Sequence, residues 1–225
     1  MRGAEHRARR HPRPGRIQAE IEIADADGVA ALSMARLAER LGSAPMSLYR
    51  HVSNKDELLV FMMDAASGEP PALPPGWRPG LEAWARALRG VYFAHPWILP
   101  VTAGRPPLEP AQLSWLDRGL SAFADTALPH GDRFEAVMTV LNYVRGEAQL
   151  IAVLLRDGSA VLDGQDEYAR MIATFVRPDR FPALAAASDA GIFRAGGGVD
   201  VDGSFQFGLA RVLDGIDRLV AGPPV

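Results

Sequence analysis

Cysteine is absent from this chain of 225 residues. Without a thiol, the chain cannot form disulfides, thiolate zinc sites, iron–sulfur clusters or a cysteine nucleophile. Long apolar runs are also lacking, because a run such as 150–155 falls far short of the roughly 20 residues that span a bilayer. The first residues are rich in arginine and have no apolar core, so we expect no secretory signal. We therefore expect a soluble, cytoplasmic protein with no membrane partner.

Signatures of catalysis and of metal binding are missing as well. There is no convincing Ser-His-Asp arrangement, pair of carboxylates or metal-ligand spacing. The Asp-Val-Asp-Gly run at 200–203 begins like a calcium loop but lacks the later ligands. The glycines at 196–198 have no following Lys-Ser or Lys-Thr, so they do not form a phosphate loop. We predict that both runs are turns and that the protein is not an enzyme and uses no metal or cofactor.

Lysine occurs once, at Lys55, and the formal net charge of the chain is −3. The charge is uneven: residues 1–56 carry a balance of +3, and the remaining residues a balance of −6. Hydrophobic residues make up 48% of the chain, which is typical of a folded protein. A basic head on an acidic body is expected when one end of a protein meets a polyanion.

Residues 1–16 contain many arginines and little apolar surface, so we expect a disordered basic arm. Such an arm either lies along DNA phosphates or is a solvated tail. Three short helical patterns follow, over about 17–27, 33–41 and 45–52. Ser33 is a plausible N-cap of the second pattern, and Gly42 ends it. Two short helices joined by a tight turn containing glycine are typical of a helix-turn-helix.

The third pattern has one core face and one outward face. Leu48 and Val52 are four residues apart and would pack inward. The outward residues are Met46, Ser47, Arg50 and His51, with Tyr49 at the flank. Donors, a fixed cation and few carboxylates suit a major groove and its phosphates. Lys55 lies in the first turn of a predicted fourth helix. A cation at that position opposes the helix dipole, so a contact with a phosphate explains this lysine better than a structural role does.

The segment 68–76 contains four prolines and separates the chain into two parts. We place a DNA-binding domain at 17–68 and a second domain at 77–225. The second domain reads as wholly helical, with helices from 79, from about 109, from 132 to about 156, over 166–176 and 182–189, and over 204–220. No strand-length alternation, internal repeat or long heptad pattern is convincing. The fold class is therefore predicted to be all-α.

Several residues of the second domain are candidates for binding a small molecule. Trp84, Trp97, Trp115 and Tyr92 either line a pocket or belong to the core. His95 either ends a helix within the core or contacts an effector. Glu147 has apolar helical neighbours, so as a partly buried carboxylate it needs a partner. That partner could be Arg145, an arginine of a second protomer or a cationic effector.

The N-terminal residues resemble those of tetracycline-repressor-like (TetR family) transcriptional regulators. The resemblance covers about 17–65, and its most specific part is Leu48-Tyr49-x-His51-Val52-x-Asn54-Lys55-x-x-Leu58-Leu59. It implies a three-helix DNA-binding head, a helical effector-binding body and a homodimer. By matched position, Ser33 and Arg36 would lie near the DNA backbone. Pro45, Met46, Ser47 and Arg50 would lie in the groove, and Tyr49, His51 and Lys55 would hold phosphates.

The second domain resembles the family more loosely. The run 101–106 is similar to the effector-pocket loop of tetracycline repressors, where the family archetype has a histidine that binds drug-chelated magnesium. This chain has Thr102 there, a far poorer ligand, so we do not expect a magnesium–tetracycline effector. The two-faced helices at about 132–156 and 204–220 are similar to the pair that forms the family's dimer interface. The effector-binding candidates are Trp84, Leu88, His95, Trp97, Thr102, Trp115 and Glu147.

These patterns predict a homodimeric transcriptional regulator. It would act as a repressor released from a palindromic double-stranded DNA operator by a small, largely apolar effector. An alternative is a helical small-molecule-binding protein or enzyme with a vestigial DNA-binding head. The acidic body leaves that alternative open. A measurement of DNA binding would distinguish the regulator from the alternative.

Overall fold

A computed structural model of the chain describes residues 14–32, 55–103, 106–156, 170, 174–192 and 200–222. Within these ranges the regular structure is helical and no strand occurs, which confirms the all-α class. The helices are α1 (Pro14–Asp27), η1 (Val29–Ala31), α4 (Lys55–Ser67), α5 (Trp77–Ala94), α6 (Ile98–Thr102), α7 (Pro110–Ser121), α8 (His130–Arg156), α10 (Pro182–Asp189) and α11 (Val201–Ala221). The second and third predicted helices lie outside the described residues, as does most of 166–176.

Helix ends follow local chemistry, and two of them correct our predictions. α1 begins at Pro14, so residues 14–16, which we assigned to the arm, are helical. α11 begins at Val201, because the Asp200 side chain accepts a hydrogen bond of 2.7 Å from the backbone N–H of Gly203. The run 200–203 is therefore the capped start of a helix and not a separate turn.

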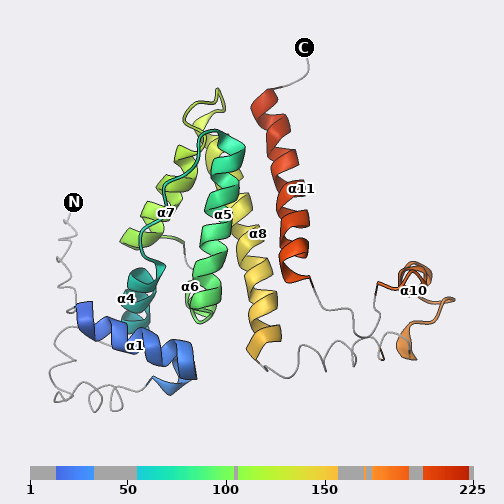
Figure 1. The fold of residues 1–225 in the computed structure, drawn as a ribbon, viewed down its shortest axis with the longest axis horizontal. Helices are drawn as coiled ribbons and strands as arrows, with labels where there is room; N and C mark the ends of the chain where they lie inside the picture. Colours follow the sequence, from blue (N-terminus) through green and yellow to red (C-terminus); the bar gives the residue numbers. More distant parts are fainter. Residues whose placement is uncertain are drawn as a thin grey trace, which may run out of the picture.

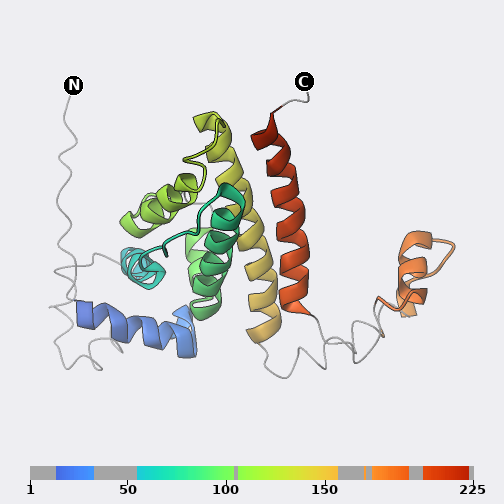
Figure 2. The ribbon, with the colours of Figure 1, turned by 45° about the horizontal axis from the view of Figure 1, so that its top comes forward.

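α5, α7, α8 and α11 form a layered bundle (Figure 1). α8 lies between α5 and α11, and α7 packs against α5 and α8. α1 and α4 pack together at one end, and α4 also contacts α6 and α7. In the turned view of Figure 2, α10 again lies apart from the bundle. Among the described residues, no helix is both long and apolar enough to cross a membrane.

The core lies where α5, α7, α8 and α11 meet. Its fully buried side chains include Trp84, Val137, Val144, Phe205 and Leu209. α7 approaches closely at Gly119, where an added Cβ would lie 2.9 Å from Val137 Cγ1 and 3.1 Å from Trp84 Cε2. On α7, Leu113 is 47% exposed. The buried face of this helix is the one that carries Trp115 and Gly119.

Candidate functional site

The residues predicted to touch DNA fall almost entirely outside the described part of the chain. They are Ser33, Arg36, Pro45, Met46, Ser47, Tyr49, Arg50 and His51. Lys55 is described: it is the first residue of α4, and its side chain is exposed to solvent. Asp56 and Glu57 share the same first turn and complement the helix dipole there. The DNA-contacting role of Lys55 stays a prediction.

A cavity lies among α5, α6, α7 and α8, beside the last turn of α4. Its space, including the part that opens to solvent, is about 470 Å³. The lining residues are Ser67, Trp84, Leu88, Tyr92, Ile98, Thr102, Pro107, Gln112, Trp115, Leu116, Leu141 and Arg145. Most of this wall is aliphatic or aromatic.

Two tryptophans form one end of the cavity. The rings of Trp84 and Trp115 meet edge to face, with centroids 6.3 Å apart. Trp84 Nε1 donates to the backbone oxygen of Trp115 at 2.8 Å, and Trp115 Nε1 donates to the backbone oxygens of Ser67 and Gly68, each at 3.0 Å. Both indole N–H groups are thus satisfied within the protein, so these rings offer a ligand mainly apolar surface.

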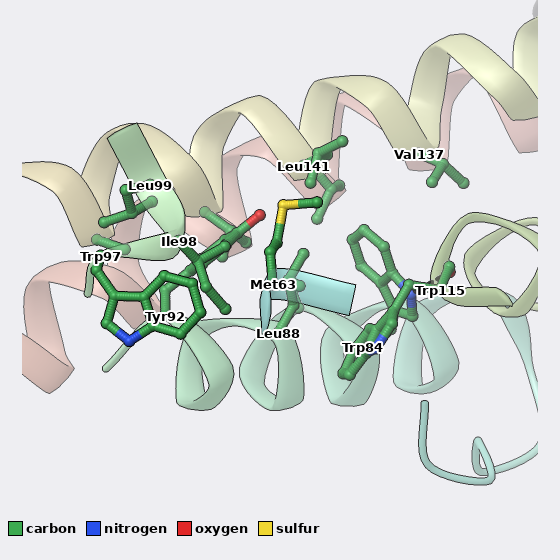
Figure 3. Packing of buried hydrophobic residues seen from close by; sticks show 14 of the residues in the cluster. Met63, Trp84, Leu88, Tyr92, Trp97, Ile98, Leu99, Trp115, Val137 and Leu141 are labelled. Carbon is green, nitrogen blue, oxygen red and sulfur yellow. Dashed lines mark hydrogen bonds between the residues drawn. The ribbon is translucent and has the colours of Figure 1, made fainter. Parts of the chain in front are cut away.

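Tyr92 and Arg145 provide a polar edge. Figure 3 shows Tyr92 beside Ile98, with Leu88 and Met63 between it and the two tryptophans. Arg145 Nε donates to the Tyr92 hydroxyl at 3.2 Å. Burial raises the pKa of Tyr92, and the positive charge of Arg145 opposes this shift only in part. Tyr92 therefore keeps its proton at neutral pH.

The other polar side chains of the wall are engaged within the protein. The Thr102 hydroxyl is buried and donates to the backbone oxygen of Leu99 at 3.0 Å. The Ser67 hydroxyl donates to the backbone oxygen of Met63 at 2.8 Å. Gln112 Oε1 accepts from the backbone of Glu109 at 3.4 Å in a capping box, and its Nε2 faces Met63 Sδ at 3.6 Å. Among the described residues, no cluster of histidines and carboxylates could hold a metal ion.

The structure brings together Trp84, Leu88, Thr102 and Trp115 of the predicted effector residues. His95 and Trp97 lie elsewhere, at the corner between α5 and α6. His95 Nδ1 lies 2.8 Å from Asp25 Oδ1, and Trp97 Nε1 donates to the same oxygen at 2.7 Å. Because both rings face the end of α1, they join the two domains and do not line the cavity.

Glu147 also lies outside the cavity wall, and its partner is none of the three we considered. Arg89 Nε and Nη2 donate to the two carboxylate oxygens of Glu147 at 3.1 and 3.2 Å. Arg89 Nη1 also donates to Asp202 at 2.7 Å, and its guanidinium stacks 4.4 Å from the ring centroids of Phe93 and Phe205. A satisfied Glu147 needs no cationic effector. The pairing joins α5, α8 and α11.

Sequence reasoning missed Arg145 as part of the cavity wall, along with Leu141 and Gln112. A signal was present on α8, where Leu141 and Arg145 are four residues apart and share one helix face. Sequence reasoning also missed the bridging role of Arg89, although Phe93 lies four residues after it on α5. A spacing of four residues places two side chains on one helix face, but it does not show which other helix packs against that face.

Comparison with known proteins identifies the family. Residues 70–220 match the sequence model of the tetracyclin repressor-like C-terminal domain, and residues 19–61 match that of the bacterial regulatory proteins of the tetR family. The chain is 36% identical over 213 residues to the HTH-type transcriptional repressor DrrR1 of Streptomyces coeruleorubidus, covering 91% of this chain and 77% of that protein. It is 30% identical over 207 residues to the class A tetracycline repressor protein from transposon 1721 of Escherichia coli, covering 90% and 88%.

Solved structures agree with the sequence relatives. The TetR family protein ActR of Streptomyces coelicolor, in complex with actinorhodin, has a TM-score of 0.74 and 27% identity, covering 94% of this chain and 96% of that one. Another transcriptional regulator of S. coelicolor, SCO7222, has a TM-score of 0.73 and 26% identity, covering 93% and 99%. With both domains matched, the chain belongs to the TetR family of transcriptional regulators.

Proposed function

We propose that this protein is a homodimeric repressor that leaves its palindromic operator when a small, largely apolar molecule occupies the cavity. The observation that carries the proposal is the position of Trp115. Its ring forms part of the cavity wall, and its indole N–H holds the backbone oxygens of Ser67 and Gly68 at the end of α4. A ligand that displaces this ring also displaces the end of α4.

α4 connects the cavity to the DNA-binding half of the chain. Its other end begins at Lys55, next to the segment predicted to enter the major groove. α4 is also fixed to α7 by Asp64, whose Oδ1 accepts from the backbone N–H of Ala111 at 2.7 Å. A shift of α7 around a ligand is therefore transmitted to α4. Such coupling requires that the ligand bind the two states with different affinity, a difference that is typically about 1–3 kcal/mol.

An apolar effector fits the chemistry of the wall better than a chelated metal does. The Thr102 hydroxyl is already used within the protein by the backbone of Leu99. ActR, which is similar in fold, binds actinorhodin, and this supports a small-molecule effector here. Trp84, Leu88, Thr102 and Trp115 remain our effector-contacting residues, whereas His95, Trp97 and Glu147 are removed from that set.

The second copy of the chain would pair through α8 and α11. In the single protomer these helices expose large apolar side chains: Leu150 is 63% exposed, Phe207 67% and Leu219 54%. A symmetric dimer would cover them and would set the spacing of the two DNA-binding heads.

Titration of labelled duplex DNA tests the proposal. The probe is the DNA upstream of the protein's own gene, followed by fluorescence anisotropy at several salt concentrations. We expect sequence-selective binding that weakens steeply with salt. We expect Arg50→Ala and Lys55→Ala each to lower the slope of log K against log salt by about one unit.

Arg177→Ala is the matched control, because Arg177 is an exposed arginine of the acidic body and pairs with Asp179. It should leave the slope unchanged. If the wild-type protein shows no salt-sensitive preference for any duplex, or if all three variants behave alike, the proposed regulator function fails. Ligand binding with no DNA affinity would instead favour a helical binding protein.

A further inference from the structure

The hydrogen-bonding groups left free in the cavity are donors. Among the described lining residues, the hydroxyls of Ser67 and Thr102 and the indoles of Trp84 and Trp115 already have protein acceptors. Arg145 uses Nε on Tyr92, and no described carboxylate forms an ion pair with it. The Tyr92 hydroxyl accepts that bond, and its own proton meets no acceptor among the described residues.

These donors form a compact polar edge on an otherwise apolar wall. Tyr92 is 4% exposed, so its hydroxyl is almost removed from water. A partly desolvated guanidinium without a counter-charge is costly, and an acceptor that carries negative charge relieves this cost. No carboxylate is found among the described lining residues, so nothing there repels an anion.

The aromatic surface lies at the opposite end. Trp84 and Tyr92 are eight residues apart on α5, a rise of about 12 Å along the helix axis. Leu88 lies between them, and Figure 3 shows these three side chains in that order. A ligand lying along this wall would meet apolar rings at one end and the donors of Tyr92 and Arg145 at the other.

We propose that the effector is an aromatic anion, with a carboxylate or phenolate oxygen bound by Arg145 and the Tyr92 hydroxyl and fused rings packed against Leu88, Trp84 and Trp115. The inference rests on the proposed function, because it names the ligand class for the same cavity. Arg145 is then the residue that selects the charge of the effector, and the two tryptophans select its flat shape.

A matched pair of probes tests charge selection in the full-length protein. Anthraquinone-2-carboxylate and anthraquinone-2-carboxamide have nearly the same shape and differ in charge at neutral pH. Isothermal titration calorimetry should show that the carboxylate binds about tenfold or more tightly than the carboxamide. Arg145→Met should abolish this preference, and Arg145→Lys should retain part of it. Tyr92→Phe should weaken binding of the carboxylate more than binding of the carboxamide.

Arg118→Met is the control, because Arg118 is exposed on α7 and does not line the cavity. It should leave the preference unchanged. Thermal unfolding of each variant verifies that it is folded, and the Arg145→Lys result decides the question if Arg145→Met is unstable. Equal binding of the two probes, no binding of either, or a preference that persists in the Arg145 variants overturns the inference. Operator binding without any probe tests the regulator function separately, so the anion site can fail while that function stands.

Discussion

Arg89 shows how much one side chain can organise in a small helical bundle. Its side chain is 11% exposed and meets Glu147, Asp202 and two aromatic rings. Burial alone would lower the pKa of Arg89, but its hydrogen bonds to Glu147 and Asp202 outweigh burial and raise it. The guanidinium thus stays charged and bridges α5, α8 and α11.

Arg89→Met should lower the free energy of unfolding by about 3 kcal/mol, because Glu147 would be left partly buried without its counter-charge. The measurement is urea unfolding at a fixed protomer concentration, since dimerisation contributes to stability. Arg86→Met is the control on the same helix, because Arg86 is 46% exposed and its bridge to Glu82 lies at the surface. Such a bridge contributes at most about 1 kcal/mol. Equal losses in the two variants would contradict the role of Arg89.

Gly208 is required for a different reason, the close approach of α11 to Tyr143 of α8. An added Cβ would collide with the Tyr143 hydroxyl and ring. That hydroxyl donates to the backbone oxygen of Phe205 at 2.9 Å, and the two rings stack with centroids 5.7 Å apart. The site leaves no room for a side chain.

Gly208→Ala should therefore lower the free energy of unfolding by about 1–3 kcal/mol through overpacking. Gly90→Ala is the contrast, because Gly90 lies on the exposed side of α5 with nothing within 4 Å of an added Cβ. That change should raise stability by about 0.5–1 kcal/mol, as expected for glycine in a helix interior. Chemical denaturation distinguishes the two signs, and stabilisation by Gly208→Ala would be inconsistent with the packing described.

At the scale of elements, the junction between α1 and the corner of α5 and α6 rests on one carboxylate. Asp25 is 30% exposed and accepts from the indole of Trp97, which is itself 2% exposed. His95 contacts the same oxygen. Trp97 adjoins Ile98 of the cavity wall, so this junction lies between the cavity and the N-terminal domain.

Asp25→Ala should leave the buried indole N–H of Trp97 unpaired, at a cost of about 1–3 kcal/mol. We expect faster amide hydrogen exchange in the last turn of α1 and through η1, by a factor of about 5 to 150. Glu22→Ala, at an exposed position of the same helix, should leave the exchange rates unchanged. Rates that match the wild type in Asp25→Ala would show that the junction does not depend on this carboxylate.

Element boundaries were predictable where a strong local signal exists. α1 ends where Gly28 adopts a φ of +76°, a conformation that favours glycine. The sequence pattern also predicted a helix at 182–189, which is where α10 lies. α6 forms although it contains Pro100, because this proline lies in the first turn, where a missing N–H leaves no helical bond unmade. The pairing of Arg89 with Glu147, 58 residues away, depends on how helices pack and left no local trace.

The candidate site was predictable only in part for the same reason. Bulky residues on the apolar stripe of α5, such as Trp84 and Leu88, were natural choices for a wall. His95 lies at the C-cap of α5, where its ring turns toward α1. Arg145 was considered only as a partner of Glu147, because helical spacing does not reveal what a neighbouring helix offers.

For the whole molecule, the exposed apolar side chains of α8 and α11 predict a dimer. Phe207→Glu would place a charge in the proposed interface, where burial of a carboxylate without a partner is costly. We expect the wild type to sediment as a dimer in analytical ultracentrifugation and this variant as a monomer. Leu113→Glu, at an exposed position of α7, should remain dimeric. A monomeric wild type, or a dimeric Phe207→Glu, would contradict this interface.

The link between the cavity and the DNA-binding head is tested most directly by an operator titration with and without a cavity ligand. Labelled operator duplex is titrated with protein by fluorescence anisotropy, in the absence of ligand and with anthraquinone-2-carboxylate at saturating concentration. We predict that the ligand raises the operator Kd by about 5- to 150-fold. Trp115→Phe loses the indole N–H that donates to the end of α4, so we expect the ligand to raise the operator Kd of this variant by a smaller factor. An operator Kd that is unchanged while calorimetry shows the cavity occupied would contradict the coupling.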